Sequence, residues 1–349
     1  MANINYHDEQ NKQNIIKMRA VLEELPPFCR DFFRGIAEYT SARTRLAYAY
    51  DIRVFFEYLH RCNPYCSKMT MKDLPVRILD MITRQDIEEY LAHVSYYEKD
   101  GKEITNAERG KARKLASLRS FYNYYFENEI IEKNPAALVP MPKRPEKEII
   151  RLDPNEVALL LEQVENGSKL TQKELEYHKK TKVRDVALLT LLLGTGIRVS
   201  ECVGLDIHDV DFDNCGIKIR RKGGYETVVY FGDEVENALL DYLDEREHII
   251  PQTGHERALF LSLQDRRMSV RSVENLVKKY ASRVTSLKKI TPHKLRSTYG
   301  TELYRATDDI YLVADVLGHK DVNTTRKHYA AQADDRKRSA RNAVHLRED

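Results

Sequence analysis

No run of about 18 consecutive apolar residues, the length that a membrane-spanning helix needs, occurs in the 349-residue sequence. The first residues, MANINYHDEQNKQ, also lack the apolar segment of a secretory signal peptide. These two absences argue against a membrane partner and against secretion. The sequence therefore predicts a cytosolic protein.

Cysteine is scarce as well, and its spacing is irregular. The five positions are Cys29, Cys62, Cys66, Cys202 and Cys215. An odd, scattered set is typical of reduced thiols rather than of a disulfide framework. His60 lies near Cys62 and Cys66, but the spacing matches no usual zinc module and no fourth ligand is evident. We therefore predict no metal site.

A strong excess of charge of one sign is missing too. Lysine and arginine number 57 and aspartate and glutamate 54, which gives a formal net charge of +3. This balance does not by itself identify a nucleic-acid-binding protein, because the basic side chains must also cluster.

The length exceeds that of a typical single domain, so we expect two domains. The segment VPMPKRPEKEI, rich in proline and charge, has the composition of an extended linker. The predicted divisions are a lead-in at 1–24, a helical domain at 25–140, a linker at 141–152, a second domain at 153–330 and a tail at 331–349.

The first predicted domain has a helical pattern throughout, up to Asn128. We expect a bundle of four helices, with Ser41 and Thr83 as N-caps and a capping box from Thr105 to Glu108. The second and fourth helices carry clustered basic residues, including Arg43, Arg45, Arg113, Lys114 and Arg119. Taken alone, such a cluster is typical of a solvated helix face.

The second predicted domain combines helices with a small sheet. The apolar run Val183–Leu193 predicts a buried helix, and Gly194-Thr195-Gly196 predicts a tight turn. Residues 166–180 fit either a loop or a surface helix. Alternating residues predict three antiparallel strands at Asp206–Phe212, Gly216–Arg221 and Glu226–Phe231. Further helices are expected at Pro154–Glu165, Glu234–Glu247 and Ser272–Val284. The fold class is thus mainly α with a small antiparallel β-sheet.

The stretch from Thr291 to Ala330 contains several functional side chains on short elements. Thr291-Pro292 predicts a helix start, which places His293 and Arg296 on one face of the first turn, where a phosphate is favoured. Gly318 is expected to end a second helix in the left-handed conformation, so that His319 follows a fixed corner. Tyr329 is expected on a third helix, capped at Asn323.

These residues resemble the C-terminal signature of the tyrosine recombinases, the phage-integrase-like family of site-specific DNA recombinases. The family pattern H-x-L-R, L-G-H and a later tyrosine is present as His293–Arg296, Leu317–His319 and Tyr329. Thr195–Glu201 matches the segment around the family's first arginine, which makes Arg198 its equivalent, and Lys222 in RRKGGYET matches the hairpin lysine.

One spacing departs from the family pattern. Tyr329 is ten residues beyond His319, whereas nine is the commoner spacing, and His328 occupies the ninth position. We keep Tyr329 as the predicted nucleophile, because a histidine nucleophile would be unlike the family.

The resemblance implies an N-terminal core-binding bundle of the SAM-like kind and a C-terminal mixed α/β catalytic domain. It also implies DNA cleavage by Tyr329 through a 3′-phosphotyrosyl intermediate, which needs neither ATP nor a metal, so no cofactor is expected. The implied catalytic residues are Arg198, Lys222, His293, Arg296, His319 and Tyr329. Of these, the arginines would neutralise the reacting phosphate, Lys222 would protonate the departing 5′-oxygen, and Glu201 would orient Arg198 through a salt bridge.

The resemblance further implies partners and a biological role. The basic residues of the N-terminal helices would contact double-stranded DNA, and four protomers would exchange strands through a Holliday junction. The tail from Ala331 to Arg347 would dock on a neighbouring protomer. The two-domain plan is most similar to Xer-type recombinases, which resolve chromosome dimers for chromosome partition at cell division. The alternatives are an integrase or transposase of a mobile element, a non-catalytic DNA-binding relative and a type IB topoisomerase, of which the last lacks the L-G-H pattern.

Overall fold

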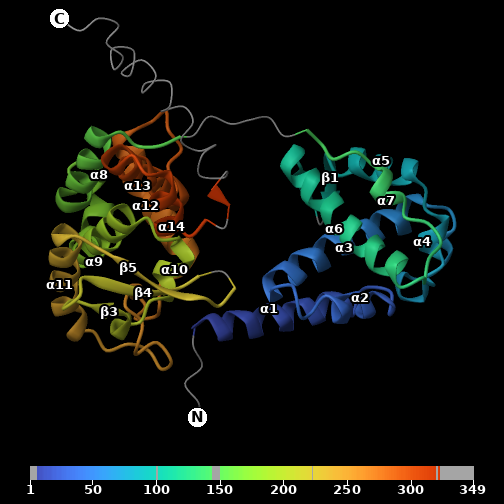
Figure 1. Cartoon of the computed structure of the whole chain (residues 1–349), viewed down its shortest axis with the longest axis horizontal. Coiled ribbons are helices and arrows are strands. Elements are labelled where there is room, and N and C mark those ends of the chain that lie inside the picture. The colour runs from blue at the N-terminus through green and yellow to red at the C-terminus, as the bar shows by residue number, and fades with distance from the viewer. Residues whose placement is uncertain (1–5, 100, 144–149, 222, 320, 323–349) are drawn as a thin grey trace, which may run out of the picture. The chain divides into compact units, whose positions relative to one another are not determined.

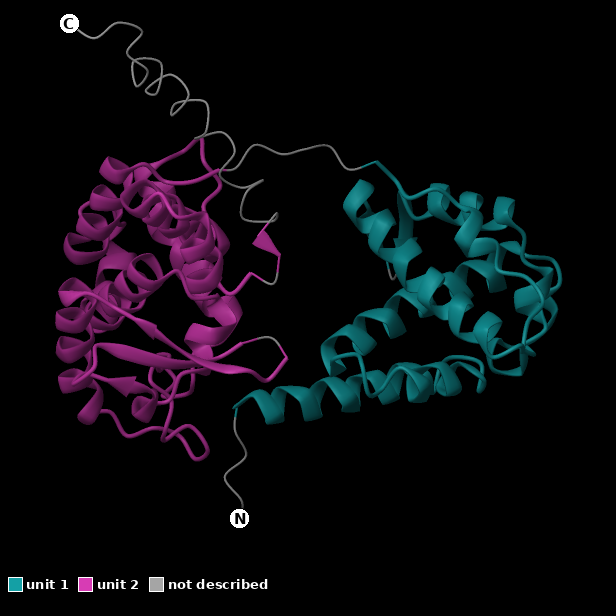
Figure 2. Cartoon of the chain, in the orientation of Figure 1, with its two compact units in different colours: residues 1–147 teal, residues 148–349 magenta. Residues whose placement is uncertain are grey.

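The computed structural model describes residues 6–99, 101–143, 150–221, 223–319 and 321–322. The chain divides into two compact units, an N-terminal unit of residues 1–147 and a C-terminal unit of residues 148–349 (Figure 2). Throughout the described ranges, every helix is too short or too polar to span a lipid bilayer.

Helices dominate the N-terminal unit (Figure 1). They are α1 (Tyr6–Leu22), α2 (Cys29–Gly35), α3 (Ala42–Cys62), α4 (Ile78–Met81), α5 (Arg84–His93), α6 (Glu108–Glu127) and α7 (Pro135–Leu138), with 3-10 turns η1 (Cys66–Lys68) and η2 (Met71–Asp73). Ser41 and Thr83 cap α3 and α5, as predicted. Helix α1 packs against α3 and adds Met18 and Leu22 to the core of this unit.

Aromatic side chains fill the core of the N-terminal unit. Phe121, Tyr122 and Tyr125 of α6 are buried, whereas Phe126 is exposed. Phe121 makes edge-to-face contacts with Phe32 at a centroid distance of 5.2 Å. Burial of one such ring contributes about 1.5–3 kcal/mol, so α6 is held mainly by its apolar face.

A two-stranded antiparallel hairpin interrupts these helices, although the sequence pattern predicted helix throughout. It consists of β1 (Tyr96–Lys99) and β2 (Lys102–Thr105). The prediction of a capping box at Thr105 is wrong, because Thr105 ends β2 and α6 begins only after Ala107. Tyrosine, isoleucine and threonine favour strands, and Gly101, at φ +67°, lies in the turn between the two strands, where a positive φ suits glycine.

The C-terminal unit is built around a long central helix. Its helices are α8 (Pro154–Asn166), α9 (Gln172–Thr195), α10 (Val199–Gly204), α11 (Asp233–Glu247), α12 (Val270–Val284), α13 (Pro292–Thr307) and α14 (Ile310–Leu317). Helix α9 contacts α8, α11 and α13 and is buried over its apolar half, as its nearly continuous apolar run predicted. Of the segment 166–180 that the sequence left open, residues 172–180 belong to α9, which begins with a capping box between Thr171 and Glu174.

Three antiparallel strands form the predicted sheet in the order β3–β4–β5 (Figure 1). They are β3 (Val210–Asp211), β4 (Gly216–Arg220) and β5 (Glu226–Tyr230). The first strand is shorter than predicted, because residues 207–209 form the 3-10 turn η3. Along β4, Ile217 and Ile219 are buried while Lys218 is exposed, so odd-numbered side chains face the interior.

Candidate active site

Arg198 stands at the corner between α9 and α10. Gly196 ends α9 at φ +61°, in the left-handed region, and Arg198 is the N-cap of α10. The backbone N–H of Arg198 donates to Oε2 of Glu201 at 2.7 Å, and its Nη1 donates to Oε1 at 2.8 Å. The buried Glu201 carboxylate therefore fixes both the main chain and the guanidinium of Arg198.

Helix α13 carries His293 and Arg296 on its first turns. Pro292 begins the helix as predicted, but the Thr291 side chain makes no capping hydrogen bond. His293 is exposed, whereas Arg296 is buried. Nη1 of Arg296 donates to the carbonyl of Gly196 at 2.6 Å, and Nη2 donates to the carbonyl of Leu317.

The segment Leu317–His319 forms the predicted corner. Gly318 ends α14 at φ +60°, and the N–H of His319 donates to the carbonyl of Ala314 at 2.9 Å. His319 is half-buried. Nη2 of Arg198 donates to the carbonyl of Gly318 at 3.3 Å. The structure thus brings the arginines of two separate motifs, Arg198 and Arg296, to the backbone that precedes His319.

Arg221 also reaches this corner, although it was not among the predicted site residues. Its Nη1 donates to the Leu317 carbonyl at 2.7 Å and its Nη2 to the Val316 carbonyl at 2.6 Å. Burial, together with the nearby charge of Arg198, lowers the pKa of Arg221. The signal was present in the sequence, since the inward face of β4 continues from Ile219 to Arg221.

Several predicted residues lie outside the described residues: Lys222, Asn323, His328, Tyr329 and the tail 331–349. The contacts of the predicted general acid and nucleophile therefore stay predictions.

Two of the five basic residues singled out in the N-terminal unit bind backbone carbonyls of the same unit. Arg45 donates from Nη1 to the carbonyls of Ala37 at 2.6 Å and Thr40 at 2.7 Å. Arg119 donates from Nε to the carbonyl of Ala136 at 3.1 Å. These contacts hold the turn that follows α2 against α3, and α7 against α6.

The other three differ in exposure. The Lys114 ammonium is buried and lies 3.3 Å from Oδ1 of Asp51, and the Ser117 hydroxyl donates to Oδ2 of the same carboxylate at 2.7 Å. Arg113 pairs with the same carboxylate but is half-exposed, and Arg43 is exposed. Arg43 and Arg113 are thus the two of the five that are most open to a ligand.

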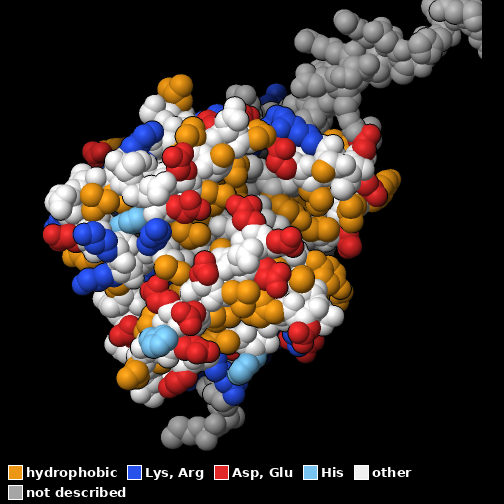
Figure 3. All heavy atoms as spheres, turned by 90° about the vertical axis from the view of Figure 1, so that its left-hand side faces the viewer, with side chains coloured by type: hydrophobic (Ala, Val, Ile, Leu, Met, Phe, Trp, Pro, Cys, Tyr) orange, Lys and Arg blue, Asp and Glu red, His pale blue; other side chains and the backbone are white. Residues whose placement is uncertain are grey.

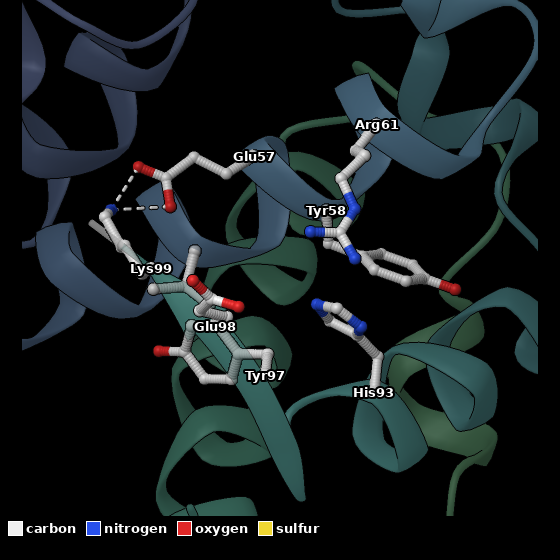
Figure 4. A pocket seen from close by; sticks show the side chains of 8 residues that line it. Glu57, Tyr58, Arg61, His93, Tyr97, Glu98 and Lys99 are labelled. Atoms are coloured by element: carbon white, nitrogen blue, oxygen red, sulfur yellow. Dashed lines mark hydrogen bonds and ion pairs between the residues drawn. The ribbon is translucent and has the colours of Figure 1, made fainter. Parts of the chain in front are cut away.

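A surface pocket of about 200 Å³ lies in the N-terminal unit between α3 and β1 (Figure 4). Its lining residues are Val54, Glu57, Tyr58, Arg61, His93, Tyr97, Glu98 and Lys99. The ring of His93 lies 5.0 Å from that of Tyr58 and 5.6 Å from that of Tyr97, and burial together with Arg61 lowers the pKa of His93. The pocket contains none of the residues that the sequence motifs identified.

Charge on one face of the C-terminal unit is mixed. Figure 3 shows acidic, basic and hydrophobic side chains interspersed over one of its faces. The first turn of helix α11, for example, carries Asp233, Glu234 and Glu236. Such mixing is typical of a solvated surface, in contrast to the three arginines gathered at the end of α14.

Within the described ranges, no group of three or more His, Cys, Asp or Glu side chains is arranged to hold a metal ion.

The segment that carries this arrangement was compared with known protein families. Residues 151–336 match the model of the phage integrase family. The chain belongs to the phage integrase family. The matched range includes all six residues predicted to be catalytic, from Arg198 to Tyr329.

Known phage integrase relatives resemble the chain over most of its length. Tyrosine recombinase XerC of Caldanaerobacter subterraneus is 32% identical over 86% of this chain and 82% of the relative. Two solved structures share the fold at 20% identity. One is the XerH site-specific recombinase bound to its palindromic difH substrate, with a TM-score of 0.63 over 86% of this chain and 80% of that chain. The other is the Tn1549 transposon integrase in complex with circular intermediate DNA. Its TM-score is 0.61, over 88% of this chain and 98% of that chain.

Proposed function

We propose that this chain is a site-specific tyrosine recombinase that cleaves and rejoins double-stranded DNA at recombination sites. The observation that carries the proposal is the convergence of Arg198 and Arg296 on the corner before His319, inside the segment that matches the phage integrase family. A cluster of permanent cations beside an imidazole suits a phosphodiester whose negative charge grows during the reaction.

The two arginines supply charge stabilisation. A guanidinium has five N–H donors, so bonds to Glu201 and to the Gly318 carbonyl orient the plane of Arg198 without using all of its donors. Arg296 has the same five donors, and the carbonyls of Gly196 and Leu317 each accept from one of its Nη atoms. Both side chains can therefore bind non-bridging phosphate oxygens.

In this proposal, Tyr329 is the nucleophile that forms the covalent intermediate. Its phenolic oxygen attacks phosphorus, the P–O5′ bond breaks, and the DNA keeps a free 5′-hydroxyl. Because a free phenol has a pKa of about 10, surrounding cations must favour loss of its proton, and His293 or His319 accepts it. Lys222 gives a proton to the departing 5′-oxygen. The reverse steps, with the 5′-hydroxyl of a partner strand, complete the exchange.

Among possible biological roles, we favour an Xer-like one. The curated relative described above is a tyrosine recombinase XerC that aligns with most of this chain. We accordingly propose action as a tetramer through a Holliday junction, with the tail docked on the next protomer, in chromosome dimer resolution. Arg43 and Arg113 are the proposed phosphate contacts of the N-terminal unit.

The second candidate is an integrase or transposase of a mobile element. It is favoured by the fold similarity to the Tn1549 transposon integrase. The position of the gene separates the two roles: a target site on the chromosome beside it supports the first, and a location inside an element with excision genes supports the second.

The test is covalent trapping on nicked suicide substrates that carry candidate sites from the DNA around the gene. We expect a protein–DNA adduct that resists denaturation with the wild-type protein and no adduct with Tyr329→Phe. Tyr311→Phe is the matched control, because Tyr311 is an exposed tyrosine of α14 outside the motif, and it should form the adduct normally.

Other outcomes reject parts of the proposal. An adduct that persists in Tyr329→Phe and disappears in His328→Ala would assign the nucleophile to His328. Specific DNA binding by the wild-type protein, without an adduct on any suicide substrate, would support the non-catalytic relative instead.

A further inference from the structure

Three successive backbone carbonyls at the end of α14 each accept a hydrogen bond from an arginine. Arg221 binds the carbonyls of Val316 and Leu317, Arg296 also binds that of Leu317, and Arg198 binds that of Gly318. The last carbonyls of a helix have no partner within the helix and lie at the negative end of its dipole. The guanidinium groups therefore supply the hydrogen-bond donors and the positive charge that this helix end lacks.

Arg221 differs from the other two arginines in the element that carries it and in the number of its bonds to α14. It directly follows β4, and its own backbone closes the β4–β5 hairpin, with its N–H donating to the carbonyl of Tyr225 at 2.7 Å and its carbonyl accepting from Gly224 at 3.1 Å. Both of its Nη atoms donate to α14. One side chain thus joins the hairpin to the helix end.

The corner is shaped to receive this side chain. A Cβ atom on Gly318 would collide with the guanidinium of Arg221, so a larger residue there would displace this side chain, in addition to the strain of its positive φ. His319 is bound through its N–H to Ala314, one turn back. Any shift of the carbonyls of Val316 and Leu317 would therefore move His319.

We infer that Arg221 is a positioning residue of the recombinase site: its paired bonds to the Val316 and Leu317 carbonyls hold the corner that presents His319. This inference rests on the proposed function. Arg221 acts through the backbone of α14. It also offsets the partial negative charge of the helix end, beside which the phosphate must bind. A lysine could donate to these carbonyls only as a single point charge and would hold them less firmly.

The test compares Arg221→Met and Arg221→Lys with the matched control Lys218→Met. Lys218 lies on β4, three residues before Arg221, but on the exposed face, where it pairs with Glu226 at 2.7 Å. We expect Arg221→Met to slow single-turnover adduct formation on the order of 10²-fold, since small misplacements of catalytic groups have such effects. Arg221→Lys should recover part of the rate, and DNA affinity should stay close to that of the wild type. A rate for Arg221→Met equal to that of Lys218→Met would overturn the inference.

A substrate with a sulfur atom in place of the 5′-bridging oxygen separates two routes. Because a thiolate leaves without receiving a proton, this substrate removes the need for the general acid next to Arg221 in the sequence. We expect the defect of Arg221→Met to persist on it, because the two bonds from Arg221 to the Val316 and Leu317 carbonyls, which we call the clamp, act on His319. Full recovery of the rate would mean that Arg221 acts through Lys222 and would reject the role at the corner.

Amide hydrogen exchange tests the clamp without reference to activity. In Arg221→Met, the amides of residues 314–319 should exchange faster than in the wild type, and in Lys218→Met they should not. Unchanged exchange in Arg221→Met would reject the clamp even if the protein recombines DNA. Conversely, faster exchange in a protein that forms no adduct with any substrate would leave the clamp standing and reject the proposed function.

Discussion

Nη1 of Arg296 donates a hydrogen bond of 2.6 Å to the carbonyl of Gly196, a hundred residues earlier in the chain. Through its other Nη atom the same side chain binds Leu317, so it ties together two helix ends that each finish in a left-handed glycine. A buried guanidinium is costly unless its donors are satisfied. Each of the two backbone corners accepts from one of its Nη atoms, and together they hold the position of its charge.

Glu201→Gln should reduce DNA cleavage. The substitution removes the charge that holds Arg198, and we expect adduct formation to slow by about 10²-fold through misplacement of the guanidinium. Glu274→Gln is the control, because Glu274 pairs with Arg271 at the same three-residue spacing on the exposed surface. Single-turnover trapping measures both, and equal rates in the two variants would contradict the orienting role of Glu201.

Gly318→Ala should affect both stability and activity more than Gly101→Ala. Both glycines have positive φ, +60° and +67°, so an alanine at either position is strained by about 1–3 kcal/mol. Only at Gly318 does the new methyl group also meet Arg221, since the space around Gly101 is open. Urea unfolding and adduct formation should separate the two variants, and matching losses would show that Arg221 moves aside freely.

Asp51→Asn should destabilise the N-terminal unit by about 3–5 kcal/mol, because it leaves the buried Lys114 ammonium without its carboxylate. Asp31→Asn removes a carboxylate from an exposed pair with Arg34 and should cost no more than about 1 kcal/mol. Thermal melting of the two variants gives the comparison. Similar melting temperatures would show that Lys114 reaches water in solution and would restore it as a candidate DNA contact.

Glu174 should give the protein part of its resistance to acid. Hydrogen bonds from Thr171, followed by the ion pair with Arg283, lower the pKa of Glu174 to about 2. Since the folded-state pKa lies below that of the unfolded chain, the stabilisation is complete above the ordinary glutamate pKa of about 4.3 and is lost as the pH falls toward 2. Urea unfolding at several pH values measures this effect. Over this range, the free energy of unfolding should depend less on pH in Glu174→Gln than in Glu302→Gln, an exposed surface control.

Local signals in the sequence were sufficient for much of the fold. The caps at Ser41 and Thr83, the apolar run of α9 and the alternation in β4 and β5 each depend on nearby residues, and each prediction is confirmed. The β1–β2 hairpin was missed because its strands are short and lie between strong helices. Gly101, between Lys99 and Lys102, was the sign of a turn that could join two strands.

The candidate site was predictable only in part, for a different reason. Motif spacing identified Arg198, Arg296 and His319, but it gave no indication that all three meet at the carbonyls that end α14. In the same way, a basic residue such as Lys114 looks available to DNA until Asp51, 63 residues away in the chain, is known to be its partner. Contacts between distant segments decide these roles, and a pattern within one segment does not contain them.

The cysteines, all of them free, have a practical consequence. In the N-terminal unit Cys29 and Cys66 are buried, whereas Cys62 is exposed at the end of α3. A maleimide dye should therefore label this unit at a single position in the unmodified chain. Because Cys215 of the C-terminal unit is half-exposed, its replacement by serine would leave a dye whose fluorescence reports when the helical unit engages a duplex.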